Sequence, residues 1–262
     1  MLPSIEIFGR SIPTYWICAL TGFAVCGLGA LLRHKDFRDL QQVDITNACA
    51  LMGIGIVVGG RLLFMLTMVP LVIRNWDILR ADPHLLYEIL TNGLVFYGGL
   101  FGAILALYWY CRHYRLDHKA FFDYLAPLFP LFHVFGRISC FLTGCCHGQV
   151  SERFGIAFTN STSAENGIPY FPIQLVGSFC NLLLFLFVRA YEKKHHREGK
   201  ALTAYLVPYA VGRFIIEFFR GDEIRGIYFG LSTSQWISLF ILAFYLIRLI
   251  RHRPRSRAPQ TA

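Results

Sequence analysis

Three charged residues share one stripe of a strongly apolar segment in the C-terminal third of the chain. Arg213, Glu217 and Arg220 follow one another at i, i+4 and i+7, which places them on one face of an α-helix. A charged side chain costs about 2.5–3.5 kcal/mol at the centre of a bilayer, so such groups usually have a function. Arg213 and Glu217 therefore belong to a binding site, or they form a neutralised structural pair beside an Arg220 that reaches toward the interface.

A second apolar segment carries His133 and Arg137 at the same helical spacing. Arg137 has no acidic residue near it in the sequence, and its planar guanidinium matches the oxygens of a phosphate group. We therefore expect Arg137 to bind an anionic lipid headgroup. His133 is either a packed, hydrogen-bonded core residue or a proton acceptor, because an imidazole titrates near neutral pH.

Thiols and a histidine cluster just after this segment. Cys140, Cys145, Cys146 and His147 follow the pattern C-x4-C-C-H, which matches none of the common zinc-binding spacings. The spacing therefore predicts no metal site. We expect the thiols either to form a disulfide or to remain free as small packed side chains.

The composition of the 262 residues is typical of a membrane protein. Hydrophobic residues make up 55% and charged residues only 16%, whereas soluble domains carry about a quarter charged residues. The net charge of +9 comes from clumps of Lys and Arg between apolar runs long enough to cross a bilayer. This distribution excludes a nucleic-acid-binding face. The first ten residues lack the cationic start of a cleavable signal peptide.

We predict an all-α, polytopic membrane protein with seven transmembrane helices. Sixteen Lys and Arg residues follow the odd-numbered spans, against six on the other side. The N-terminus is therefore expected outside the cytoplasm and the C-terminus inside. The predicted spans are Thr14–Leu32, Ala50–Val69, Gly93–Cys111, Ala120–Gly144, Phe171–Ala190, Ala201–Phe219 and Ser232–Ile250.

All spans and connections are predicted to form a single domain, residues 1–262. Two longer connections, Pro70–Asn92 and Cys145–Pro169, fall on the extracytoplasmic side. The second is rich in turn-forming residues and predicts a small head. The basic tail, residues 248–262, is expected to lie near anionic lipid in the cytoplasm.

Five short motifs, spread over most of the chain, resemble those of the prolipoprotein diacylglyceryl transferase family. The longest resembles the family's signature segment. The others resemble the entry to its first helix, its glycine-pair motif, the motif after its head and the motif of its sixth helix. In sequence order the five are Ile12–Tyr15, Phe96–Leu100, Gly136–Gly148, Phe171–Leu175 and Gly212–Arg220.

The resemblance implies a transferase of the bacterial inner membrane. It would move the diacylglyceryl group from phosphatidylglycerol to the lipobox cysteine of a prolipoprotein signal peptide. Such a transferase is surrounded by membrane lipid, and the resemblance implies neither a cofactor nor a nucleic-acid partner. A thiol then attacks a glycerol carbon and a phosphate ester leaves, so the site needs cations at the phosphate and a proton acceptor for the thiol.

The resemblance also implies roles for individual residues. Arg137 and Arg213 match the family's essential arginines, and Glu217 and Arg220 match its supporting pair. Three further residues lie in matching motifs and are expected to contact the substrate, although two of them also suit close helix packing. These three are Tyr15, Gly98 and Gly99.

The chain departs from the family's pattern at four positions. Tyr97 replaces a histidine that has been considered the base, and a tyrosine with a pKa near 10 is a poor proton acceptor. Cys140 and Thr143 each replace an asparagine, and Cys145 replaces a glutamate. We expect Tyr97 to act as a hydrogen-bonding residue.

The sequence therefore does not assign the residue that accepts the proton of the thiol. His133 and His147 are possible bases, or the acceptor thiol ionises without one because nearby arginines raise its thiolate fraction. Two other functions are compatible with the sequence. One is a divergent paralogue that uses the same donor lipid with another acceptor, and the other is a non-catalytic lipid-binding membrane protein.

Overall fold

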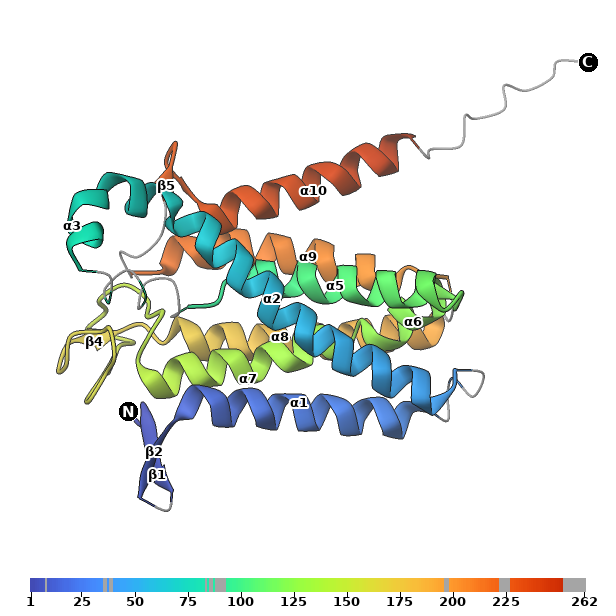
Figure 1. Cartoon of the computed structure of the whole chain (residues 1–262), viewed down its shortest axis with the longest axis horizontal. Coiled ribbons are helices and arrows are strands. Elements are labelled where there is room, and N and C mark those ends of the chain that lie inside the picture. Colours follow the sequence, from blue (N-terminus) through green and yellow to red (C-terminus); the bar gives the residue numbers. More distant parts are fainter. Residues whose placement is uncertain are drawn as a thin grey trace, which may run out of the picture.

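The structure is a computed structural model in which most of the long helices run side by side and α2 crosses them obliquely (Figure 1). The helices are α1 (Thr14–Arg33), α2 (Gln42–Arg74), α3 (Trp76–Ala81), α5 (Phe96–His113), α6 (His118–Leu125), α7 (Leu128–Thr143), α8 (Ile173–Lys194), α9 (Ala201–Ile216), the 3-10 helix η2 (Glu217–Phe219) and α10 (Thr233–Arg251). The described residues are 1–7, 9–34, 37, 40–82, 84, 87, 93–195, 198–221 and 227–251.

Helical structure coincides with each of the seven predicted spans, which confirms the all-α prediction. Six helical segments are long and apolar enough to cross a membrane. α5 is not among them, because its 18 residues end in Arg112 and His113 and its apolar part is shorter than a crossing usually needs. The six segments are α1, α2, α6 with α7, α8, α9 with η2, and α10.

The prediction of one continuous helix over Ala120–Gly144 is wrong. The chain forms two helices, α6 and α7, separated by a turn at Ala126 and Pro127. Proline has no backbone N–H and its ring clashes with the preceding helical turn, so the helix stops and restarts there. α7 then begins at Leu128 and carries the two predicted site residues of this span.

The boundaries of two predicted connections also change. α2 continues through Pro70 to Arg74 and is followed at once by α3, so the predicted connection Pro70–Asn92 began too early. Part of that connection lies outside the described residues, as does the basic tail after Arg251.

Three two-stranded hairpins gather at one end of the bundle. They pair β1 (Ser4–Ile7) with β2 (Arg10–Pro13), β3 (Ile156–Ala157) with β4 (Pro169–Tyr170), and β5 (Ile227–Tyr228) with β6 (Leu231–Ser232). The connections after α1, α5 and α8 and the C-terminal end of α10 lie at the opposite end (Figure 1). The bundle therefore separates its loops into the two groups that the charge pattern predicts.

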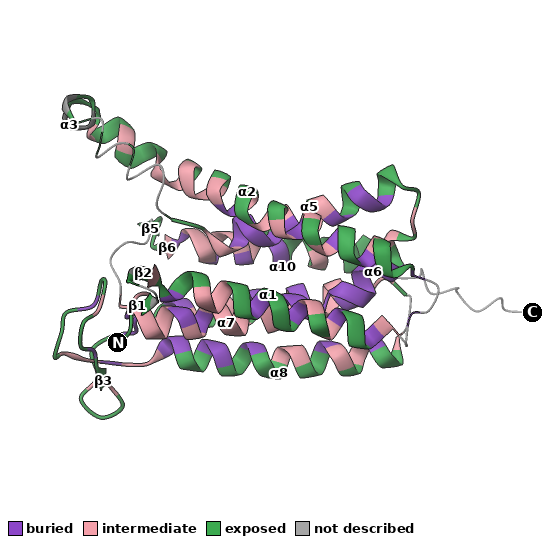
Figure 2. Ribbon diagram, turned by 60° about the horizontal axis from the view of Figure 1, so that its bottom comes forward, coloured by how far each residue is buried: buried purple, intermediate pink, exposed green. Residues whose placement is uncertain are grey.

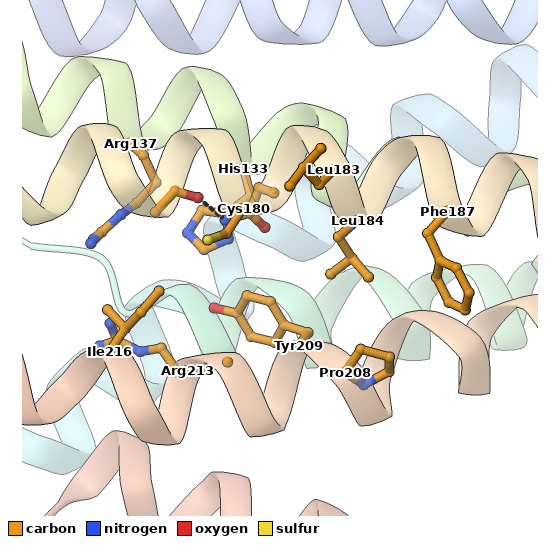
Figure 3. A pocket seen from close by; sticks show the side chains of 13 residues that line it. His133, Arg137, Cys180, Leu183, Leu184, Phe187, Pro208, Tyr209, Arg213 and Ile216 are labelled. Atoms are coloured by element: carbon orange, nitrogen blue, oxygen red, sulfur yellow. Dashed lines mark hydrogen bonds between the residues drawn. The ribbon is translucent and has the colours of Figure 1, made fainter.

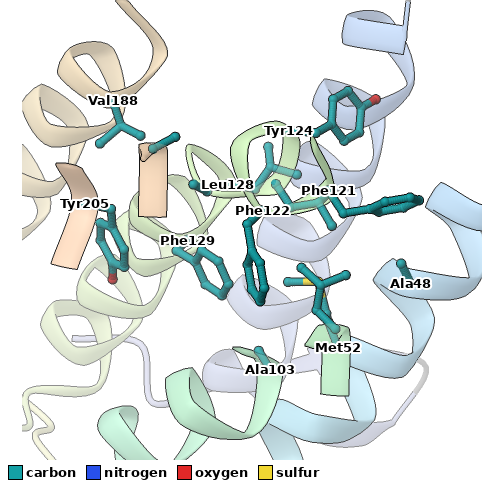
Figure 4. Close-up of a cluster of buried hydrophobic side chains, with 14 of the residues drawn as sticks. Ala48, Met52, Ala103, Phe121, Phe122, Tyr124, Leu128, Phe129, Val188 and Tyr205 are labelled. Carbon is teal, nitrogen blue, oxygen red and sulfur yellow. The ribbon is translucent and has the colours of Figure 1, made fainter. Parts of the chain in front are cut away.

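Buried residues gather where the helices meet one another, and exposed residues lie on the outer sides of the bundle (Figure 2). Many of the exposed residues are large and apolar. One buried cluster joins Phe121 and Phe122 of α6 to Met52 of α2 and Ala103 of α5 (Figure 4). The exposed apolar faces suit a lipid environment, since soluble monomers rarely expose large apolar patches.

α2 and α5 meet through four glycines. A methyl group on any of them would overlap the backbone of the other helix, so the two helices approach as closely as backbones can. The four are Gly55, Gly59, Gly98 and Gly102.

The predicted head is tied to the ends of three helices. The segment after α7 bonds on one side to the start of α8, where Gly148 N donates to Phe171 O at 3.1 Å. On the other side it bonds to the end of α9, where Gly221 N donates to His147 O at 3.1 Å. These bonds hold the end of α7 beside Arg220.

Candidate active site

A cavity of about 1240 Å³ opens among the helices near the hairpins. A second cavity of about 370 Å³ lies between α7, α8 and α9 and has mainly apolar walls, including Leu184 and Phe187 (Figure 3). Four residues line both cavities and so form the boundary between them: His133, Arg137, Tyr209 and Arg213. The second cavity is therefore an apolar slot, and polar side chains line its boundary with the larger cavity.

Three buried polar atoms at this boundary have no hydrogen-bond partner among the described residues. They are Nη2 of Arg137, Nδ1 of His133 and Oη of Tyr209. Buried polar groups in proteins are nearly always hydrogen-bonded, so such a group requires an explanation. A bound anionic ligand would satisfy the guanidinium and the hydroxyl together.

Arg137 occupies a space that a glycine leaves free. Its side chain comes from α7 and is only 8% exposed. A Cβ at Gly177 of α8 would lie 2.8 Å from Arg137 Nε, so only glycine lets the guanidinium lie there undisturbed. Gly177 carried no signal in the sequence analysis, because the contact joins two helices.

Glu217 holds two arginines at the end of α9. Its Oε2 lies 2.8 Å from Arg213 Nη2 and 3.5 Å from Arg220 Nη1, and Glu217 is 2% exposed. The predicted stripe therefore exists as a buried ion-pair network. All three residues line the larger cavity. With Arg137, the site carries three arginines against one glutamate, an excess of positive charge that suits a phosphate.

Tyr97 belongs to a second chain of hydrogen bonds. Its Oη lies 2.7 Å from Oγ of Ser238, and that Oγ donates to the carbonyl of Ser234 at 2.8 Å. Because the Ser238 hydroxyl has one proton, Tyr97 is the donor to Ser238. Oγ of Ser234 in turn accepts from Arg213 Nη2 at 3.0 Å. Ser234 and Ser238 were not predicted as site residues, and their i, i+4 spacing on α10 is their only signal in the sequence.

The two candidate bases differ in their surroundings. His133 lies in both cavities, with its ring stacked on Phe96 at a centroid distance of 3.7 Å. His147 lines only the larger cavity, where its Nδ1 lies 3.0 Å from Gly148 O and its ring packs against Tyr170. The structure brings His133 together with the arginines at the boundary.

The remaining predicted substrate contacts separate into two kinds. Tyr15 and Gly99 line the larger cavity. Gly98 is not among its lining residues and packs against Gly59 of α2. The alternative of close helix packing therefore describes Gly98 better than a substrate contact does.

A model of the prolipoprotein diacylglyceryl transferase family matches residues 4–251. The chain belongs to this family. The family that the motifs resemble is thereby confirmed. Among similar proteins is the phosphatidylglycerol–prolipoprotein diacylglyceryl transferase of Clostridium tetani (strain Massachusetts / E88), which is 35% identical over 251 residues, covering 95% of this chain and 97% of the relative.

A second relative, phosphatidylglycerol–prolipoprotein diacylglyceryl transferase 2 of Clostridium perfringens (strain 13 / Type A), is 33% identical over 238 residues and 90% of each chain. A third relative is the phosphatidylglycerol–prolipoprotein diacylglyceryl transferase of Idiomarina loihiensis (strain ATCC BAA-735 / DSM 15497 / L2-TR). It is 30% identical over 240 residues, covering 90% of this chain and 87% of the relative.

Three of the four expected departures from the prolipoprotein diacylglyceryl transferase pattern, Cys140, Thr143 and Cys145, lie together at the end of α7. Thr143 Oγ1 donates to Cys145 Sγ at 3.3 Å, and Cys140 and Cys146 lie beside them on the cavity wall. All eight cysteines are free, which agrees with the expectation of free thiols and not with a disulfide. Hydrogen bonds from Cys140 and Cys145, and the charges of Arg220 and Arg137, hold the pKa of the Cys146 thiol well below its usual value.

Proposed function

We propose that this chain transfers the diacylglyceryl group of phosphatidylglycerol to the lipobox cysteine of prolipoproteins, in the inner membrane of a bacterium. Its seven helical spans, α5 included, cross that membrane with the N-terminus and the hairpin end outside the cytoplasm. The donor lipid and the acceptor protein are those after which the similar transferases are named.

One observation carries the proposal: unpartnered polar atoms of Arg137 and Tyr209 lie where a charged cavity meets an apolar slot. A phospholipid has the same division, with a phosphate next to long acyl chains. Its phosphate would lie at the boundary between Arg137 and Arg213. An acyl chain would extend between α8 and α9 along Leu184 and Phe187 (Figure 3).

The charges of the site favour the transition state over the bound donor. The acceptor sulfur forms a bond to the glycerol carbon while the bond from that carbon to the phosphate oxygen breaks. The leaving glycerol phosphate gains one negative charge in this step. Arg137 and Arg213 would therefore bind the departing phosphate more strongly than the intact lipid, which is the condition for catalysis.

His133 is the proton acceptor in this proposal. It shares the boundary with both arginines, and its buried Nδ1 has no partner among the described residues. Tyr97 already donates its hydroxyl proton to Ser238. His147 lies farther into the head, against Tyr170. An unpartnered imidazole nitrogen beside the phosphate is the better placed of the three to take the thiol proton.

Complementation tests the proposal. The chain is expressed in bacteria depleted of their own transferase, and conversion of a reporter prolipoprotein is followed by its mobility and by lipid labelling. The wild type is expected to restore lipidation. Arg137→Ala and Arg213→Ala should each abolish it. Arg112→Ala, at an exposed position at the far end of α5, is the matched control and should behave as wild type.

Unlipidated prolipoprotein in the presence of membrane-inserted wild-type chain would overturn the proposal. Binding of phosphatidylglycerol without transfer to a lipobox peptide would then indicate a lipid-binding protein. Transfer to a different acceptor would indicate the divergent paralogue. Both outcomes are read from one assay with radiolabelled donor lipid and the purified chain in detergent.

A further inference from the structure

Three sulfur atoms meet on the wall of the larger cavity, at the end of α7. Cys140 lies in the last turn of this helix, and Cys145 and Cys146 follow its C-cap. Their Sγ atoms all lie within 4.8 Å of one another. Among the residues that the structure describes, this is the one group of three or more thiol, imidazole or carboxylate ligands close enough to share an ion.

The backbone holds the three thiols together. Gly144 ends α7 in a left-handed conformation with φ 74°, and Cys145 N donates back to Cys140 O at 3.0 Å. Gln174 of α8 donates to Cys145 O at 2.8 Å. Cys146 has φ 54°, a conformation that costs energy for a residue with a side chain and is concentrated at functional sites.

The spacing of the sulfurs fits a single ion. A zinc–sulfur bond is about 2.3 Å long, so three thiolates around one ion in tetrahedral or trigonal geometry lie about 3.8–4.0 Å apart. The three sulfurs lie within 4.8 Å of one another, so side-chain movements of at most about 1 Å bring them to this spacing. A disulfide, by contrast, would use two of these cysteines and leave the third unexplained.

We propose that Cys140, Cys145 and Cys146 form a three-thiolate binding site for a soft metal ion, Zn(II) or Cu(I). Three thiolates give the complex one net negative charge with Zn(II) and two with Cu(I). Arg137 and Arg220, which line the same cavity, offset that charge. This proposal departs from the expectation of no metal, which rested on spacing in the sequence alone.

Zinc in such a site keeps a fourth position open to the cavity. A further consequence rests on the proposed function: the thiol of the lipobox cysteine would occupy this fourth position on the ion. Coordination to the ion would lower the pKa of the lipobox thiol, His133 in the same cavity would take its proton, and the thiolate sulfur would form the bond to the glycerol carbon as the phosphate ester leaves. This would compensate for Tyr97 at the place of the usual histidine.

Metal titration tests the site without reference to transfer activity. The purified chain is reduced, stripped of metal and titrated with Zn(II), and separately with Cu(I), against a chromophoric chelator. We expect one equivalent bound tightly. Cys140→Ser, Cys145→Ser and Cys146→Ser should each weaken binding by about 100-fold or more, since loss of even an outer-shell partner costs 10–100-fold. Cys180→Ser, an exposed cysteine on α8, is the control and should have no effect.

A readout on the unaltered chain guards against variants that misfold. Bound metal should slow alkylation of Cys140, Cys145 and Cys146, followed by mass spectrometry, at least tenfold relative to Cys180. If neither ion binds better to the wild type than to the triple serine variant, the site is refuted. If metal binds but its removal leaves transfer unchanged, the site stands and the acceptor-binding step is wrong. If no transfer occurs with or without metal, the proposed function fails and the binding result decides the site.

Discussion

The hydroxyl of Tyr97 lies 2.7 Å from Oγ of Ser238 and donates its proton to it. This bond ties α5 to α10 at the position where the motif resemblance led us to expect a histidine. Through Ser234 the same chain reaches Arg213. We therefore expect Tyr97 to support the position of Arg213 and not to accept the thiol proton.

The Tyr97→Phe variant measures this role. It removes one hydrogen bond between neutral groups, which usually contributes about 0.5–1.5 kcal/mol. We expect transfer to a lipobox peptide to fall by no more than about tenfold, with a matching fall for Ser238→Ala. A loss of about 1000-fold or more in folded Tyr97→Phe protein would instead place the hydroxyl in the chemistry.

His133→Gln should reduce the rate of transfer by about 100-fold or more, because general-base catalysis typically contributes a factor of 10²–10⁴. The acidic limb of the pH–rate profile should flatten in the same variant. His147→Gln is the matched comparison, since it removes a histidine that lines only the larger cavity, and it should cost less than about tenfold. A larger loss of transfer rate in His147→Gln than in His133→Gln would assign the base to His147.

Gly177→Ala should lower activity with little change in thermal stability. The new methyl group would lie 2.8 Å from Arg137 Nε and displace a flexible guanidinium, whereas no backbone has to move. The apparent affinity for the donor lipid and the rate should both fall. Gly27→Ala on α1, where a methyl group meets nothing within 4 Å, is the control. Equal activity of the two variants would mean that Arg137 need not lie in its observed place.

Glu217→Gln should destabilise the fold by about 3–5 kcal/mol, because it leaves buried arginines without their shared carboxylate. The midpoint of thermal unfolding in detergent should drop, and Glu217→Asp should restore part of the loss. Glu198→Gln removes a carboxylate from an exposed pair with Lys200 and should leave the midpoint unchanged. An unchanged midpoint in Glu217→Gln would show that the network contributes little to stability.

Single cysteines test the orientation of the bundle. Glu165→Cys lies in the head, and Glu198→Cys lies in the connection between α8 and α9, at the opposite end. A membrane-impermeant maleimide applied to intact spheroplasts should label the first and spare the second. Permeabilised cells should show both labelled. Labelling of Glu198→Cys alone in intact cells would reverse the proposed orientation.

The sequence by itself determined the helices, the separation of the loops into two groups, and the stripe of Arg213, Glu217 and Arg220. These features depend on neighbours a few residues apart, where helical periodicity and hydropathy decide the outcome. The break at Pro127 was also present in the sequence as a proline, but hydropathy summed over a long span concealed it.

Tertiary structure alone decided how the helices meet. The space beside Gly177 for Arg137, the bond from Tyr97 to Ser238 and the assignment of Gly98 to packing each join residues of different helices. The three cysteine sulfurs are close in sequence, yet only the left-handed turns after α7 bring them onto one wall of the cavity. Such contacts depend on the packing of whole helices and on single backbone conformations, which residue type and spacing do not fix.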